Sequence, residues 1–173
     1  MSGAPDPDLH IFAAIVENKF GVLARIAGLF SRRGFNIFSL AVAPTNDPGY
    51  SRITIVVDVH NTDVDQIAKQ LDKLINVIHI SELQPAHSIE RELMLARVGA
   101  HDRAAVERVV EPWGGEVLDE SAAELIVSVD AHPDDIDRCE AELAQFGIRV
   151  LQRTGRIALR ELSEQAPEVA LAD

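Results

Sequence analysis

The order of its hydrophobic patterns constrains the fold of this chain more than any other feature. Apolar runs of strand length alternate with segments in which apolar residues recur every three or four positions, as along one face of a helix. In the first half, the pattern predicts strands at residues 10–16, 36–44, 50–59 and 77–83. Two helical segments interrupt these strands in the order β-α-β-β-α-β, which is the ferredoxin-like arrangement.

The two helices of the first half have recognisable start and stop residues. The first is expected between Gly21 and Gly34. Its apolar face carries Val22, Leu23, Ile26, Leu29 and Phe30. The second is expected to be capped by Thr62 or Asp63 and to end at Asn76. Its apolar face carries Val64, Ile67, Leu71 and Leu74.

The second half repeats this order with almost no shared identity. The predicted elements are a strand at residues 92–100, a helix from Asp102 to Pro112, a hairpin at 116–131, a helix from Pro133 to Gly147, and a strand at 148–162 bent at Gly155. The sequence therefore predicts an α+β protein of two ferredoxin-like units, residues 8–84 and 90–162. A disordered tail is expected at 163–173 because that segment is small and acidic.

The distribution of charge supports two units and argues against nucleic acid as the main partner. The formal net charge is −12, whereas phosphate binding draws on clustered Lys and Arg. Residues 8–84 contain seven basic and eight acidic residues, but residues 85–173 contain nine and nineteen. This shift indicates a junction between two units near Pro85.

Apolar content and residue usage are typical of a soluble globular protein. No apolar run is long enough to cross a bilayer, and the opening residues MSGAPDPD do not resemble a secretory signal, so we expect a cytoplasmic protein without a membrane partner. The single cysteine, Cys139, excludes an internal disulfide and is expected to be a buried thiol. The six histidines show no short metal-ligand spacing, so no metal site is expected.

The start of the first helix differs from the other three predicted helix starts. Those three have acids in or before the first turn, namely Asp63 and Asp65, Asp102, and Asp134 with Asp135. The first helix has none, so the N–H groups of Gly21 to Leu23 offer a place for a carboxylate or phosphate. An alternative is that Gly21 is a tolerated N-cap and Asn18 folds back as a substitute cap. The residues alone leave both interpretations open.

Two asparagines add to the ligand interpretation. Asn18 and Asn36 are expected at neighbouring strand ends, where their amides would converge on one small polar ligand, within a chain or across a dimer. An amide both donates and accepts hydrogen bonds, which suits a zwitterion. The alternative is ordinary turn chemistry, because asparagine is common at both kinds of position.

Several sequence blocks resemble one family. They are ENKFGVLARIAGLFSRRGFNI (residues 17–37), SLAVAPT (39–45), SRITIVV (51–57), KQLDKLINVI (69–78), RELMLARV (91–98) and FGIRVLQRTG (146–155). In this order they resemble the small, regulatory subunit of acetolactate (acetohydroxyacid) synthase. The resemblance runs from about residue 9 to residue 160.

This resemblance implies a function. The first half would be an ACT domain, which pairs side by side in a homodimer and holds an amino-acid effector between protomers. Members of the family lack a catalytic site, bind and activate the large catalytic subunit, and confer feedback inhibition by branched-chain amino acids, typically valine. Thiamine diphosphate, magnesium and FAD are expected on the large subunit, and no cofactor is expected in this chain. The second unit would support the dimer and contact the large subunit.

The resemblance also assigns an effector site. Asn18, Gly21, Val22 and Leu23 would hold the effector's head group, and Asn36 and Ile37 would come from the neighbouring protomer, with Ile37 forming an apolar wall. Phe20 and Phe38 depart from the residues usual in the family, where these positions often hold Pro or Ser and an acid, respectively.

Other functional classes fit less well. An ACT-domain regulator of a different enzyme or of transcription is the alternative to the family assignment. Nucleic-acid binding by this fold needs exposed aromatics and basic surroundings, whereas aromatics make up 5% of the chain. An acylphosphatase would need an arginine in a phosphate cradle, and Arg25 falls beyond the turn. The sequence therefore predicts no catalytic residues.

Overall fold

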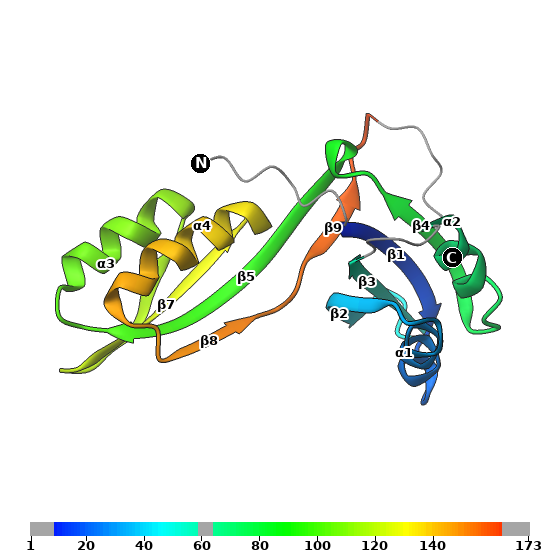
Figure 1. The fold of residues 1–173 in the computed structure, drawn as a ribbon, viewed down its shortest axis with the longest axis horizontal. Coiled ribbons are helices and arrows are strands. Elements are labelled where there is room, and N and C mark those ends of the chain that lie inside the picture. The colour runs from blue at the N-terminus through cyan, green and yellow to red at the C-terminus, as the bar shows by residue number, and fades with distance from the viewer. Residues whose placement is uncertain (1–8, 59–63, 164–173) are drawn as a thin grey trace. The chain divides into compact units, whose positions relative to one another are not determined.

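The chain forms two compact units. The computed structural model describes residues 9–58 and 64–163. The first unit comprises Met1–Ile89 and Arg156–Asp173, and the second comprises Glu90–Gly155. Each unit contains an antiparallel sheet and two helices (Figure 1). The predicted α+β class and the two ferredoxin-like units are confirmed.

The first unit is built on a four-stranded sheet. Its strands are β1 (Leu9–Glu17), β2 (Asn36–Pro44), β3 (Tyr50–Asp58) and β4 (Val77–Leu83), in the spatial order β2-β3-β1-β4. Helix α1 (Val22–Arg33) connects β1 to β2, and α2 (Val64–Leu71) connects β3 to β4. Side chains alternate between the faces of a strand, so one face of β1 meets the helices through Phe12, Ala14 and Val16.

The two faces of this sheet have separate cores. On the helix side, Ile26 and Phe30 of α1 and Ile67 of α2 are almost fully buried, and the Phe30 and Phe35 rings meet edge to face with centroids 6.1 Å apart. On the opposite face, Ile11, Val56 and other residues pack with Ala158. Burial of these side chains supplies most of the driving force for folding of the unit.

The second unit repeats the arrangement. Its strands are β5 (Ser88–Gly99), β6 (Glu116–Glu120), β7 (Glu124–Ala131) and β8 (Val150–Arg153), in the order β6-β7-β5-β8. Helices α3 (Arg103–Val110) and α4 (Pro133–Leu143) lie side by side over this sheet (Figure 1). Cys139 is buried between them and the strands, as expected, and burial raises the pKa of its thiol to about 11, assisted by Glu142.

Two element predictions are wrong. Helix α2 ends at Leu71 instead of Asn76, and the chain then turns through Leu74, whose N–H bonds the Leu71 carbonyl at 2.9 Å. The single last strand is two strands, β8 and β9 (Ile157–Arg160), separated at Gly155, which has a φ of 81°. Strand β9 pairs with β5 and belongs to the first unit, so the second unit ends before the predicted residue 162.

Some predictions lie outside the described residues. These are the caps Thr62 and Asp63 and residues 164–173 of the expected tail.

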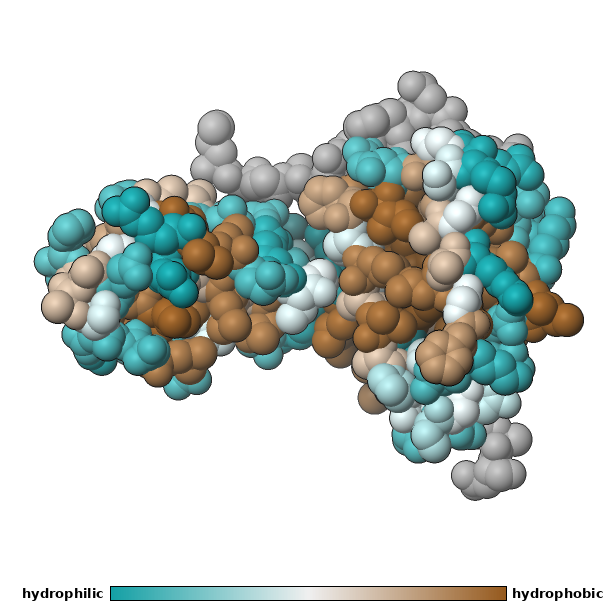
Figure 2. All heavy atoms as spheres, turned by 90° about the horizontal axis from the view of Figure 1, so that it is seen from below, coloured by the Kyte–Doolittle hydropathy of each residue, from teal (hydrophilic) through white to brown (hydrophobic). Residues whose placement is uncertain are grey.

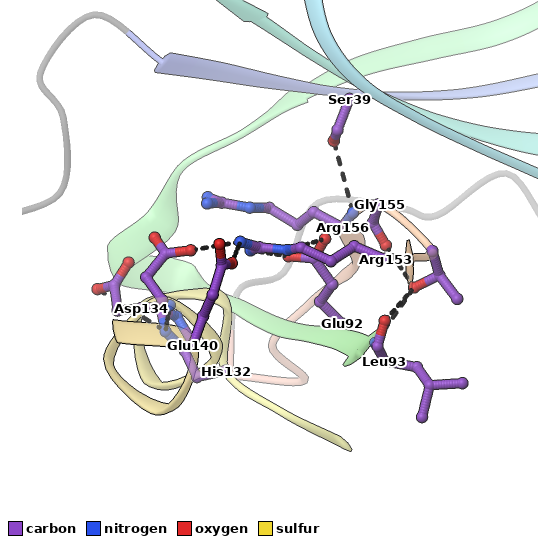
Figure 3. A network of polar contacts seen from close by, with 11 residues as sticks. Ser39, Glu92, Leu93, His132, Asp134, Glu140, Arg153, Gly155 and Arg156 are labelled. Carbon is purple, nitrogen blue, oxygen red and sulfur yellow. Dashed lines mark hydrogen bonds and ion pairs between the residues drawn. The ribbon is translucent and has the colours of Figure 1, made fainter. Parts of the chain in front are cut away.

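A half-buried arginine connects the sheet of the second unit to α4 (Figure 3). Arg153 of β8 binds Glu92 of β5 with two hydrogen bonds, 3.1 Å from Nε and 2.7 Å from Nη2. Its Nη1 also contacts Asp137 and Glu140 of α4 at 2.6 and 3.1 Å. Burial alone would lower the pKa of Arg153, but the bonds to Glu92 and Asp137 outweigh it and raise that pKa.

Candidate functional site

The first turn of α1 has no side-chain cap. β1 ends at Glu17, and the chain turns through Asn18 to Gly21 before α1 begins at Val22. Gly21 has φ 82° and ψ −6°, a left-handed conformation that glycine adopts without steric cost. Among the described residues no side chain caps this helix, and its first turn contains no acid. The predicted uncapped start of this helix is therefore confirmed.

Two other helices are capped. In α3, the Asp102 carboxylate accepts a hydrogen bond from the Ala105 N–H at 2.9 Å, as predicted. In α4, Asp134 and Asp135 lie in the first turn as predicted, but the cap itself is His132, whose Nδ1 accepts from the Asp134 N–H at 3.3 Å. The start of α2 lies outside the described residues, so the contrast with α1 holds for α3 and α4.

Removal of the α3 cap should destabilise the second unit. We expect Asp102→Ala to lower its free energy of unfolding by about 1 kcal/mol, because the Ala105 N–H loses its acceptor. Trp113, the single tryptophan, belongs to this unit, so denaturant unfolding followed by its fluorescence reports on this unit. Asp130→Ala, at an exposed position on β7, is the control and should change little. Equal losses for the two variants would contradict the assigned cap.

Most N–H groups at the start of α1 lack a strong acceptor. Val22 donates to the Lys19 carbonyl over 3.4 Å, which is long for such a bond. In the part of the chain that the structure describes, no oxygen accepts from the N–H of Gly21 or Leu23. Helix N-termini carry partial positive charge, so these donors favour an anion.

Asn18 does not cap the helix. Its side-chain amide donates to the Pro48 carbonyl at 3.0 Å, and its backbone N–H donates to the Gly49 carbonyl at 2.8 Å. Both bonds join the turn before α1 to the β2–β3 hairpin. Gly21 is the N-cap residue, as the alternative interpretation held, but its second part, Asn18 as a substitute cap, is wrong. The Asn18 Oδ1 has no donor within residues 9–58 and 64–163 and remains an acceptor at the surface.

The predicted site residues differ in exposure. The Val22 side chain is in the core, so only its backbone faces the turn, whereas Leu23 is 40% exposed and Gly21 is exposed. Ile37 is half-buried against the core, and Asn36 is exposed. Phe20 and Phe38 are also exposed.

Exposed apolar side chains are numerous on the first unit. Figure 2 shows a broad hydrophobic area on the right, where this unit lies. The exposed apolar residues of α1, β2, the turn before α1 and the turn before β4 are Phe20, Leu23, Phe38, Val42 and Ile75. Large exposed apolar patches typically mark interaction sites.

Asn18 and Asn36 do not converge within one chain. In the sheet, Asn36 lies opposite Asp58, which also faces Leu9 at the start of β1, whereas Asn18 follows the end of β1. β1 and β2 run parallel on either side of β3, so the start of β2 lies at the far end of the sheet from Asn18. At about 3.3 Å per residue, the two asparagines are about 30 Å apart along the strand direction. The prediction of neighbouring strand ends is wrong within one chain; the interpretation across a dimer is untested.

A polar network that the sequence did not reveal borders the turn. The Glu17 carboxylate accepts from Lys19 Nζ at 2.9 Å through Oε1 and from the Asn76 amide through Oε2. Arg25 Nη1 in turn donates to Asn76 Oδ1 at 2.6 Å. The bonds to Lys19 and Asn76 hold the pKa of Glu17 below its ordinary value. Asn76 was predicted only as a helix end, and no local pattern distinguishes it.

The described residues contain neither a candidate membrane-spanning helix nor a candidate metal site. None of their helices is both long and apolar enough to cross a membrane. Across residues 9–58 and 64–163, no group of three or more His, Cys, Asp and Glu side chains is placed to hold a metal ion.

Comparison with known proteins identifies the family of both halves. Residues 12–79 match the family described as "AHAS small subunit-like ACT domain", and residues 91–161 match "Small subunit of acetolactate synthase". The acetolactate synthase small subunit of Mycobacterium bovis is 44% identical over 155 residues, covering 88% of this chain and 92% of that protein. That of Mycolicibacterium smegmatis is 41% identical over 152 residues, covering 87% and 89%.

A solved structure supports the same assignment. The crystal structure of the acetolactate synthase small subunit from Thermotoga maritima superposes with a TM-score of 0.81 at 31% identity, covering 88% of this chain and 97% of that one. The predicted resemblance is confirmed by family matches, relatives and this structure. The chain therefore belongs to the acetolactate synthase small subunit family, and its N-terminal unit is an ACT domain.

Proposed function

We propose that this chain is the noncatalytic regulatory subunit of acetolactate synthase. It activates the large catalytic subunit and makes it sensitive to feedback inhibition by valine or another branched-chain amino acid. Family membership supports the partner, and the uncapped start of α1 is the observation that supports the effector site. The same membership favours this proposal over an ACT-domain regulator of another enzyme or of transcription.

The chemistry of the α1 start suits an amino-acid head group. The effector carboxylate accepts hydrogen bonds from the N–H groups of Gly21 and Leu23, while its ammonium group donates to Asn18 Oδ1. Gly21 has open space where a Cβ would lie, so a ligand can approach the backbone closely. We call residues 18–21 the effector loop. Asn18 is held to the β2–β3 hairpin, so this loop is largely preorganised.

A homodimer completes the site. Strand β2 is an outer strand of its sheet, and its free edge is a template for another strand. A two-fold axis perpendicular to the sheet pairs β2 with a second β2 in antiparallel fashion. The partner's Asn36 and the partner's Ile37 then lie beside Pro44, at the sheet end that holds Asn18. The dimer thus brings Asn36 and Ile37 to the site, although within one chain they lie at the opposite end of the sheet from Asn18.

Regulation requires coupling between the effector site and the large subunit. An effector shifts activity only if it binds one conformation or assembly better than another, and such coupling is typically about 1 to 3 kcal/mol. Thiamine diphosphate, magnesium and FAD are assigned to the large subunit in this proposal, and this chain supplies no cofactor ligand.

Reconstitution tests the proposed function. Acetolactate formation by the large subunit of the same organism is measured alone, with this chain added, and with valine, leucine or isoleucine titrated into the mixture. We expect the chain to raise the rate and one branched-chain amino acid to lower it again. A rate that does not change on mixing would contradict the proposal.

Charge at the β2 edge should disrupt the dimer. Phe38, 60% exposed, lies at a bulge in β2, where the register shifts between Ile37 and Ser39. We expect Phe38→Asp to shift the protein from dimer to monomer in light scattering, because each new carboxylate then lies inside the β2–β2 interface, where it loses solvent without gaining a partner. Leu118, 53% exposed at the equivalent bulge of β6, provides a matched control in Leu118→Asp. Dissociation by Leu118→Asp alone would place the interface elsewhere.

A further inference from the structure

Asn76 joins the two segments on either side of the effector loop. It lies directly before β4 and is half-buried. Its backbone carbonyl accepts from the Glu17 N–H at 2.9 Å, and its side-chain amide donates to Glu17 Oε2. Its Oδ1 accepts from Arg25 Nη1 at 2.6 Å. One residue therefore connects the end of β1 to the first turn of α1.

The pairing of β1 with β4 ends just before Glu17, where Asn76 provides the hydrogen bonds instead. The pairing of β1 with β4 shifts register between Ile15 and Val16, and its last pair is Val16 with Val77. Beyond that pair, Glu17 is held to the neighbouring chain segment by Asn76 instead of by a further strand pair. The chain that leaves β1 toward Gly21 is therefore held on one side by β3 and the β2–β3 hairpin and on the other side by Asn76.

The same bonds control a negative charge next to the site. The Glu17 carboxylate is one residue from Asn18, which is proposed to bind the effector's ammonium group. Lys19 and Asn76 each bind one oxygen of this carboxylate. Without Asn76, only the exposed Lys19 side chain holds this carboxylate, which is then freer to turn toward an incoming carboxylate and repel it.

We infer that Asn76 is a positioning residue of the effector site. It does not touch the effector; it orients the N–H groups at the start of α1 and restrains the Glu17 carboxylate. The inference rests on the proposed function, because it assumes that the effector loop binds an amino acid.

Calorimetry with valine on the full chain tests this role. We expect Asn76→Ala, which changes no charge, to weaken valine binding about tenfold, because Glu17 and Arg25 lose their shared partner. Asn46→Ala, at an exposed position of the β2–β3 loop, should bind as the wild type does. Thermal unfolding of each ligand-free variant shows whether it is folded at the assay temperature. If Asn76 only adds stability, Asn76→Ala will lower the melting temperature but leave the valine affinity of the folded protein unchanged. That result would overturn the inference.

A reciprocal variant tests the hydrogen bond itself. Combining Asn76→Asp with Glu17→Gln exchanges donor and acceptor and conserves the net charge. The new amide at position 17 then donates to the new carboxylate at position 76, which still accepts from Arg25. We expect valine affinity to recover to within about twofold of the wild type, as complementary pairs restore coupling in double-mutant cycles. A double variant as weak as Asn76→Ala would overturn the inference.

Hydrogen exchange separates failure of this inference from failure of the proposed function. If the wild type binds none of the branched-chain amino acids, the proposed effector site is wrong. The backbone amides of Arg25 and Ile26 are the first that form hydrogen bonds within α1, and their hydrogen exchange can be measured without a ligand. We expect this exchange to be faster in ligand-free Asn76→Ala than in the wild type. Unchanged exchange at these amides would overturn the role assigned to Asn76.

Discussion

Replacing Gly21 by aspartate is expected to weaken valine binding by about 10- to 100-fold. The new carboxylate lies at the helix start, where the effector's carboxylate is proposed to bind, and like charges about 4 Å apart near a protein surface repel by about 1 to 4 kcal/mol. The aspartate side chain also competes for the free N–H groups of the first turn. Both effects act in the same direction. Titration calorimetry with the full chain measures the loss.

Gly21→Asn is the matched control for this variant. Asparagine has nearly the same shape as aspartate and tolerates the left-handed conformation that Gly21 adopts at φ 82°, so it carries the same backbone strain without the charge. We expect it to weaken binding much less than Gly21→Asp does. Equal affinities for wild type and Gly21→Asp would reject anion binding at this helix start.

Loss of Arg153 should give the largest change in stability. Arg153→Met leaves the Glu92 carboxylate, whose side chain is 7% exposed, without its two hydrogen bonds. It also leaves Asp137 and Glu140 repelling each other and Glu92. Breaking a buried ion pair on one side typically costs about 3 to 5 kcal/mol. Arg153 is itself 26% exposed, so we expect the lower end, about 3 kcal/mol.

Trp113 fluorescence during denaturant unfolding measures this loss in the second unit. Arg108→Met is the surface control, because the Arg108 side chain is 68% exposed and its Nη2 lies 4.0 Å from Asp102 Oδ2. We expect this variant to change the free energy of unfolding by less than about 1 kcal/mol. Adding Glu92→Met to Arg153→Met should recover part of the loss by removing the unpaired carboxylate. If Arg153→Met lowers the free energy of unfolding no more than Arg108→Met does, the Arg153 network contributes little to stability.

Local signals predicted the elements well where one strong residue defines a boundary. Gly21 and Gly34 bound α1, Asp102 caps α3 and Pro133 begins α4, as expected. Each of these effects depends on backbone conformation or on hydrogen bonds within one turn of helix. The length of α2 was overestimated because Leu74 continues the helical spacing, although the chain turns after Leu71 to reach β4.

The candidate site shows the same division between local and distant effects. The free start of α1 was predictable, since capping involves only residues nearby in the sequence. The separation of Asn18 from Asn36 was not predicted, although it follows from the parallel course of β1 and β2 in this topology. The role of Asn76 was also not predictable, because its side-chain partners Glu17 and Arg25 are 59 and 51 residues away in the sequence.

The sequence by itself determined the order of strands and helices, most of the residues that face each core and the absence of an acid at the start of α1, because these properties depend on residue type and short-range spacing. Leu23 was predicted on the core-facing side of α1 but is exposed. Its resemblance also identified the family. Only the tertiary structure decided that β9 joins the first unit, that Asn36 lies at the far end of its own sheet, and that Asn76 connects β1 to α1. These features depend on strand register and on contacts between distant segments, which many side-chain interactions set together and no local pattern records.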